Sequence, residues 1–247
     1  MAGIGVVNAK EKSGMTYEAG IYKNDKQQTM PYRIAIPPKY DANKKYPLVL
    51  CLHGAGGRGT DNRGRGIQAF RSLATADVVA KHPAFLLAPQ CPKGKKWVNS
   101  DWKKGSYSLK NVKISEQLKL VMEILAKVRK EFNIDPARIY VTGQSMGGFA
   151  TWDIIMRYPD LFAAAVPVCG AGDPEMAKKI VKLPVWAFHG DADRTVPLSG
   201  SRDMVTALKK LNGNIKYTEF PGVGHGSWKN TWKKKDLITW LFSQQKS

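Results

Sequence analysis

The chain has 247 residues, a length that fits one large α/β domain, and 43% of them are hydrophobic, which is ample for a packed core. Its 39 lysines and arginines outnumber 20 aspartates and glutamates, which gives a formal net charge of +19. No apolar run is long enough to span a bilayer, and no low-complexity tract or internal repeat is apparent, so transmembrane, disordered and repeat classes are excluded.

The N-terminus does not show the basic and then apolar plan of a signal peptide. Met1-Ala2-Gly3 fits a native start or a start that replaces a removed leader. The compartment is therefore left open between a secreted or periplasmic protein whose leader is gone and a cytoplasmic one.

The cysteines and histidines show no metal-ligand or disulfide spacing. The three cysteines lie singly in or beside apolar runs and are interpreted as small core residues: Cys51, Cys91 and Cys169. The four histidines are scattered among glycine, proline and apolar neighbours: His53, His82, His189 and His225. The prediction is no metal site.

The positive charge has two interpretations. Lysine clusters such as Lys93/Lys95/Lys96 and Lys233 to Lys235 could hold the chain near an anionic polymer or membrane surface, or could simply keep it soluble. No nucleic-acid-binding motif accompanies the charge, so no specific nucleic-acid partner is predicted.

Residues 1–45 are predicted to form an antiparallel hairpin at a sheet edge. Tyr17 to Tyr22 and Pro31 to Ile36 are strand-like, with a polar turn between them. Pro47 to Leu52 is a continuous apolar run, typical of a parallel strand that is buried on both faces.

A glycine-rich loop, His53-Gly54-Ala55-Gly56-Gly57, follows that strand. Glycines at a strand end let the backbone approach a ligand and direct N–H groups at it. The loop is a candidate for half of an oxyanion hole, with the N–H of Ala55 as donor, and a plain glycine turn is the alternative.

The next segment is predicted to be a helix over Ile67 to Ala80 and a buried strand over Ala84 to Ala88. Residues 90–111 then form a long irregular connection, which is uncommon in compact domains and often functional. It is interpreted as one wall of a substrate site. Trp97 and Trp102 are candidate substrate-binding residues, or aromatics that pin the loop to the body.

The strongest motif is Gly143-Gln144-Ser145-Met146-Gly147, which matches G-x-S-x-G. A helix from Ser115 to about Phe132 precedes it, and Ile139 to Val141 form a strand directly before it. A helix to about Arg157 follows, and its N-terminal N–H groups and dipole would face the serine. This strand, turn and helix present Ser145 as a nucleophile.

The rest of the chain continues the alternation of strands and helices. Strands are predicted at Phe162 to Val168, Pro184 to Phe188 and Ile215 to Phe220, and helices at Glu175 to Val181, Ser199 to Leu211 and Leu237 to Phe242. The pattern predicts an α/β fold: a mostly parallel sheet with helices on both faces, after the N-terminal hairpin. Active sites of such sheets lie at the carboxyl ends of the strands.

A serine nucleophile needs a base and a group that orients the base. His225 lies in a glycine-flanked loop after the last strand and is the predicted base. Asp191 and Asp193 both qualify as the orienting carboxylate. The N–H groups of Met146 and Ala55 would hold the oxyanion.

Four motifs in this order resemble the α/β-hydrolase superfamily from about Pro47 onward: Leu52 to Gly56, Gly143 to Gly148, His189 to Pro197 and Gly224 to Trp228. The chain is more closely similar to bacterial carboxylesterases of the feruloyl esterase, phospholipase/carboxylesterase or predicted peptidase kind. In the related dienelactone-hydrolase and feruloyl-esterase groups, the acid lies three residues before Val-Pro, a position that Asp193 holds here.

The resemblance implies a single α/β-hydrolase domain over residues 1–247 and no cofactor. It also implies a serine carboxylic-ester hydrolase with an acyl-enzyme, acting on plant cell-wall esters (feruloyl or acetyl) or other small aromatic or short-chain esters. Trp228 is a further candidate substrate-binding residue. The alternatives are a peptidase of the prolyl-oligopeptidase-like group and a non-catalytic protein that binds anionic polymers.

Overall fold

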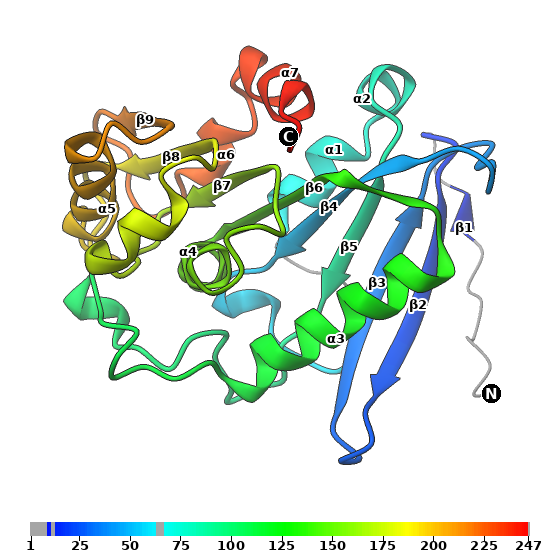
Figure 1. The fold of residues 1–247 in the computed structure, drawn as a ribbon, viewed down its shortest axis with the longest axis horizontal. Coiled ribbons are helices and arrows are strands. Elements are labelled where there is room, and N and C mark those ends of the chain that lie inside the picture. The colour runs from blue at the N-terminus through cyan, green and yellow to red at the C-terminus, as the bar shows by residue number, and fades with distance from the viewer. Residues whose placement is uncertain (1–8, 11–12, 63–66, 247) are drawn as a thin grey trace.

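The computed structural model describes residues 9–10, 13–62 and 67–246 (Figure 1). The predicted domain range and the predicted N-terminal segment include residues 1–8, 11–12, 63–66 and 247, which lie outside the described residues.

The strands of the described residues form one sheet of nine, in the order β1-β2-β3-β5-β4-β6-β7-β8-β9. Their bounds are β1 Ala9–Lys10, β2 Thr16–Lys23, β3 Thr29–Ile36, β4 Tyr46–Leu52, β5 Phe85–Pro89, β6 Ile134–Gln144, β7 Ala164–Val168, β8 Val185–Gly190 and β9 Ile215–Phe220.

The strand directions confirm the predicted fold class. β2 and β3 form an antiparallel hairpin, and β3 pairs antiparallel with β5. From β5 through β4, β6, β7 and β8 to β9, every neighbouring pair is parallel. The carboxyl ends of these six strands therefore meet along one edge of the sheet.

The helices lie between the strands in sequence. Their bounds are α1 Gln68–Leu73, α2 Ala76–Lys81, α3 Glu116–Glu131, α4 Met146–Arg157, α5 Ser199–Lys210, α6 Trp228–Thr231 and α7 Lys235–Ser243, with 3₁₀ turns η1 Ala55–Gly57, η2 Trp102–Lys104 and η3 Pro174–Ile180. Helix α3 begins where Ser115 accepts a hydrogen bond from the Leu118 N–H, as the sequence predicts.

Helices cover both faces of the sheet (Figure 1), and a hydrophobic core lies between the sheet and each layer of helices. On β4, Leu48 and Leu50 belong to the core shared with α3, α4 and α5, whereas Val49 and Cys51 belong to the core shared with α1, α2 and α7. Side chains alternate between the faces of a strand, so a run that is apolar at every position supplies both cores.

The helix predicted over Ile67 to Ala80 is in fact two helices, α1 and α2. Thr75 has extended backbone angles, and its hydroxyl donates to the Ser72 carbonyl. A threonine side chain that bonds the backbone competes with the helical ladder, which accounts for the break.

Strand β6 starts earlier than predicted, at Ile134. Its register against β4 shifts between Tyr46 and Leu48, across the stretch that holds Pro136. Proline cannot donate to the ladder, so the sequence there resembles a turn even though the chain remains in the sheet.

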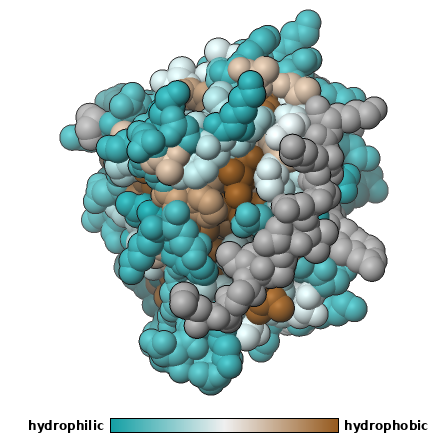
Figure 2. Space-filling view, turned by 90° about the vertical axis from the view of Figure 1, so that its right-hand side faces the viewer, coloured by the Kyte–Doolittle hydropathy of each residue, from teal (hydrophilic) through white to brown (hydrophobic). Residues whose placement is uncertain are grey.

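Figure 2 faces the side of the molecule on which β1, β2 and β3 lie. Hydrophilic residues dominate its rim, and hydrophobic residues gather near its centre. Within 9–10, 13–62 and 67–246, no helix is both long and apolar enough to cross a membrane.

Candidate active site

Ser145 stands at a sharp turn between β6 and α4. Its backbone has φ 55° and ψ −120°, a conformation that a residue with a Cβ seldom adopts. The Ser145 N–H donates to the Val168 carbonyl at 2.9 Å, which ties the turn to the end of β7. The strained backbone projects the hydroxyl beyond the sheet edge.

The two glycines of the motif are required by close backbone approach. A Cβ on Gly147 would lie 2.1 Å from the Leu52 carbonyl oxygen, and one on Gly143 would lie 2.2 Å from the Gly147 oxygen. Only glycine lets the end of β4, the turn and the start of α4 come this close together.

Three distant side chains meet at this edge. The Nε2 atom of His225 lies 2.8 Å from the Ser145 Oγ, and its Nδ1 lies 2.7 Å from the Asp193 Oδ2. The Asp193 side chain is 0% exposed, and that of His225 is 24% exposed. The arrangement has the geometry of a Ser-His-Asp triad, with the carboxylate on the shielded side of the imidazole.

Asp193 is surrounded by hydrogen-bond donors. Its Oδ1 accepts from the N–H groups of Thr195 and Val196, at 2.8 and 3.0 Å. Burial by itself would raise the pKa of this carboxyl group. Hydrogen bonds from His189, His225 and the two N–H groups outweigh burial and hold the pKa well below its usual range. The carboxylate is therefore ionised at neutral pH.

The other candidate acid, Asp191, is directed elsewhere. It is exposed, and its Oδ1 accepts from the Gly222 N–H at 2.6 Å, which holds the turn after β9. Only Asp193 of the two has a carboxylate oxygen in hydrogen-bond contact with His225.

The glycine-rich loop after β4 lies beside the serine. A Cβ on Gly54 would be 3.5 Å from the Ser145 Cβ. Ala55 begins η1 and Met146 begins α4, and the first N–H groups of a helix have no partner within its own ladder. These two N–H groups remain the proposed oxyanion donors.

The imidazole of His53 supports the glycine-rich loop. The Cys91 N–H donates to its Nε2 at 2.9 Å, so the ring proton must be on Nδ1, which lies 2.6 Å from the Gly54 carbonyl. Burial, with the nearby charge of Arg58, lowers the pKa of His53 to about 4. His53 is thus a neutral brace for the loop.

Of the two roles predicted for Trp97, substrate contact and pinning of the loop, its position fits the second. It is 0% exposed, and its indole N–H donates to the His53 carbonyl at 3.0 Å. A side chain in this position cannot contact substrate directly. The physical reason is that the long loop folds inward here and uses Trp97 to support the backbone of the glycine-rich loop.

The rest of the long loop is anchored to the body. The Tyr107 hydroxyl donates to Asp153 on α4 at 3.0 Å, and the Leu109 N–H donates to Asp173 at 2.7 Å. Trp102 is partly exposed, with the Lys96 ammonium group 4.7 Å from its ring centre. Substrate contact by Trp102 stays a prediction.

Trp228 packs edge-on against the His225 ring, with the ring centres 5.3 Å apart and the planes at 89°. The indole restricts the tilt of the imidazole and is itself partly exposed. Its position beside the base fits either a substrate contact or a support for His225.

A further cluster of possible metal ligands overlaps the triad. The ligand atoms of Cys169, Asp193 and His225 lie within 4.8 Å of one another. Burial raises the pKa of the Cys169 thiol to about 12, and its Sγ already donates to the His225 carbonyl at 3.7 Å. The histidine and the carboxylate bond to each other, and the cluster suits a triad better than a metal.

Comparison with known sequences places these features in context. The sequence profile of the Esterase family, described as "Putative esterase", matches residues 24–241. The chain is 24% identical over 211 residues to the "Probable feruloyl esterase C" of Aspergillus flavus, and the match covers 84% of this chain and 70% of that protein.

Solved structures show the same fold. A crystal structure of a thermostable esterase has a TM-score of 0.86 and 38% identity, over 93% of this chain and 63% of that one, so the chain spans less than two thirds of that relative. The Pyrococcus horikoshii acylaminoacyl peptidase has a TM-score of 0.68 at 18% identity, over 95% of this chain and 42% of that one. The second likeness concerns the fold alone.

Proposed function

Since the chain belongs to the Esterase family and has the α/β-hydrolase fold, we propose that it is a serine carboxylic-ester hydrolase that acts through Ser145, His225 and Asp193. The observation that carries the proposal is the continuous hydrogen-bonded path from the Ser145 hydroxyl through His225 to the buried Asp193 carboxylate. Residues 1–247 are proposed to form one domain, because the hairpin and the parallel strands share one sheet.

The geometry supports a two-step reaction. His225 takes the Ser145 proton as the hydroxyl oxygen attacks the ester carbonyl, and then gives that proton to the leaving alcohol. Water then attacks the acyl-serine, with His225 again as base, and the acid is released. Asp193 keeps the imidazole in the required tautomer and stabilises the imidazolium that forms in each step.

Negative charge develops on the carbonyl oxygen in both steps. The N–H groups of Ala55 and Met146, at the starts of η1 and α4, are proposed to receive it. Each donor of this kind is typically responsible for about 3 kcal/mol of transition-state stabilisation. His53 and Trp97 would keep the Ala55 side of this hole in place.

The proposed substrates are plant cell-wall esters, feruloyl or acetyl, or other small aromatic or short-chain esters. The similarity to a protein named feruloyl esterase C supports this choice. The test is a comparison of kcat/KM among methyl ferulate, acetylated xylan, p-nitrophenyl acetate and an N-acyl peptide amide. We expect the esters to be cleaved and methyl ferulate to rank first. Preferential cleavage of the amide would favour the peptidase alternative.

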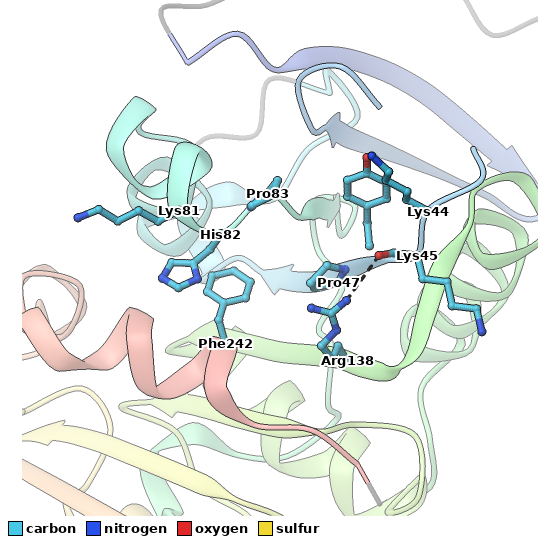
Figure 3. Close-up of a pocket in the computed structure, with 9 residues that line it drawn as sticks. Lys44, Lys45, Pro47, Lys81, His82, Pro83, Arg138 and Phe242 are labelled. Atoms are coloured by element: carbon cyan, nitrogen blue, oxygen red, sulfur yellow. Dashed lines mark hydrogen bonds between the residues drawn. The ribbon is translucent and has the colours of Figure 1, made fainter. Parts of the chain in front are cut away.

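We also propose weak association with anionic polymers. A pocket of about 330 Å³ lies at the amino ends of β4 and β6, away from the triad (Figure 3). Four of its lining residues are cationic, namely Lys44, Lys45, Lys81 and Arg138, and none is a carboxylate. The other lining residues are Tyr46, Pro47, His82, Pro83 and Phe242. A cleft lined by one sign of charge focuses the field of a chain with net charge +19.

Part of this charge is available to a ligand. Arg138 bonds Asp135 through Nε and donates from Nη2 to the Lys45 carbonyl at 3.5 Å (Figure 3), so Nη1 is the nitrogen left to a ligand. Lys44 has only a 3.7 Å contact with Asp41. Lys45 and Lys81 form no ion pair with any other residue of the described ranges. Flat surfaces of Pro47, Pro83 and Phe242 would suit a ring that carries a carboxylate, as in a polyuronate.

The pocket is tested with the Ser145→Ala chain and immobilised polygalacturonate. Binding should weaken steeply as salt is raised, because exposed charges are screened. The double variant Lys45→Ala/Lys81→Ala should bind several-fold more weakly than Lys209→Ala/Lys210→Ala, which removes the same charge from α5. If binding does not depend on the salt concentration, or if both double variants lose affinity equally, this pocket is not the binding site.

A further inference from the structure

The imidazole of His189, near the end of β8, is the second one that lies against the Asp193 carboxylate. It is fully buried, and its Nε2 lies 3.3 Å from the Asp193 Oδ2, the same oxygen that accepts from His225. We infer that His189 is a positioning residue that shares the carboxylate with His225 and sets how readily His225 acts as a base. This inference rests on the proposed function.

The position of the ring proton follows from the neighbours. Nε2 faces two acceptors, the Val196 carbonyl at 3.2 Å and the Asp193 Oδ2, so it must carry a hydrogen that they share. Nδ1 lies 2.8 Å from the Ser201 Oγ, which is also 3.2 Å from the Gly170 carbonyl. Every polar atom of the imidazole is therefore satisfied, and the ring cannot turn without losing several bonds.

The other charged or titratable groups around His189 are accounted for. On β9, Glu219 lies opposite His189 in the strand register, and Arg202 bonds it through both Nε and Nη2. Directly after β7, Cys169 is buried, and its thiol donates to the His225 carbonyl at 3.7 Å. Asp193 is thus the carboxylate in direct contact with the His189 N–H.

The sign of the effect follows from charge sharing on one oxygen. The His189 N–H withdraws part of the negative charge that Oδ2 would otherwise direct at His225. Without it, the carboxylate would stabilise protonated His225 more strongly, and the neutral form that accepts the serine proton would require a higher pH. His189 therefore limits how strongly the Asp193 carboxylate stabilises protonated His225.

The experiment compares His189→Gln with His189→Met. Glutamine can place an N–H near the Nε2 position, whereas methionine fills similar space without a donor. The readout is the acid side of the pH profile of kcat/KM for p-nitrophenyl acetate, which reports the essential base of the free enzyme. We expect the half-maximal pH to move up by about half a unit in His189→Met and to return toward wild type in His189→Gln.

Ser201→Ala is the matched control. It disturbs the same buried cluster by removing the partner of His189 Nδ1, but the hydrogen on His189 Nε2 still points at the Asp193 carboxylate. It should lower the melting temperature and leave the acid side of the profile unmoved. If His189→Met folds and its profile also stays unmoved, His189 only braces the loop and the inference is wrong. Loss of the proposed function would instead appear as full activity in Ser145→Ala.

Discussion

Replacing Ser145 with alanine is expected to lower kcat for p-nitrophenyl acetate by about 10⁶-fold, because the acyl-enzyme cannot form without its oxygen. The change removes one hydroxyl whose hydrogen-bond partner among the described side chains is His225, so the fold should be retained. The measurement is ester hydrolysis under saturating substrate, with circular dichroism to check the fold.

A fluorophosphonate probe gives an independent reading of the same residue. It should label the wild-type chain and the control Ser243→Ala, in which an exposed hydroxyl far along the chain is removed, and should fail to label Ser145→Ala. Wild-type turnover in Ser145→Ala would end the assignment of the nucleophile.

Asp193→Asn is expected to lower kcat by roughly 10⁴-fold, because an amide in this position favours the wrong tautomer of the base. The substitution keeps the size of the side chain. It replaces the carboxylate oxygen next to His225 Nδ1 with either an uncharged amide oxygen or an amide N–H. The pH profile and kcat of the purified variant provide the measurement.

Asp191→Asn is the natural comparison, since the sequence alone leaves both aspartates as candidate acids. Asp191 is exposed and bonds the turn at Gly222, so its replacement should change kcat by no more than a few-fold. The reverse order of effects would show that the acid has been assigned to the wrong aspartate.

The parts of the fold that local sequence encodes were predictable. The glycines around Ser145, the cap at Ser115 and the apolar run of β4 each act through contacts with near neighbours or through strand burial. The mostly parallel sheet and the hairpin follow from such local signals, and the strand pairings confirm them.

Trp97 and the α1–α2 break depend on contacts that local patterns do not report. An aromatic residue in an irregular loop can be exposed or buried, and only the position of His53 in space decides it. Likewise, the helical periodicity from residue 67 to residue 80 is real, but one threonine bond to Ser72 interrupts it.

The role of His189 likewise depends on a contact that local sequence patterns do not report. His-Gly before the acid looks like a simple end to a strand, and sequence spacing does not show that residues 189 and 193 turn back toward each other. The carboxylate contact appears only once β8, the loop and α5 are assembled around Ser201.

The left-handed backbone at Ser145 has a consequence for attempts to make this chain more heat-resistant. Holding a residue with a side chain at φ 55° costs on the order of 1–2 kcal/mol, and glycine at the same place would avoid that cost. The variant with the least backbone strain, glycine at residue 145, would therefore lack the nucleophile. At residue 145 chemical reactivity and thermal resistance are opposed, and engineering for the latter has to begin elsewhere in the molecule.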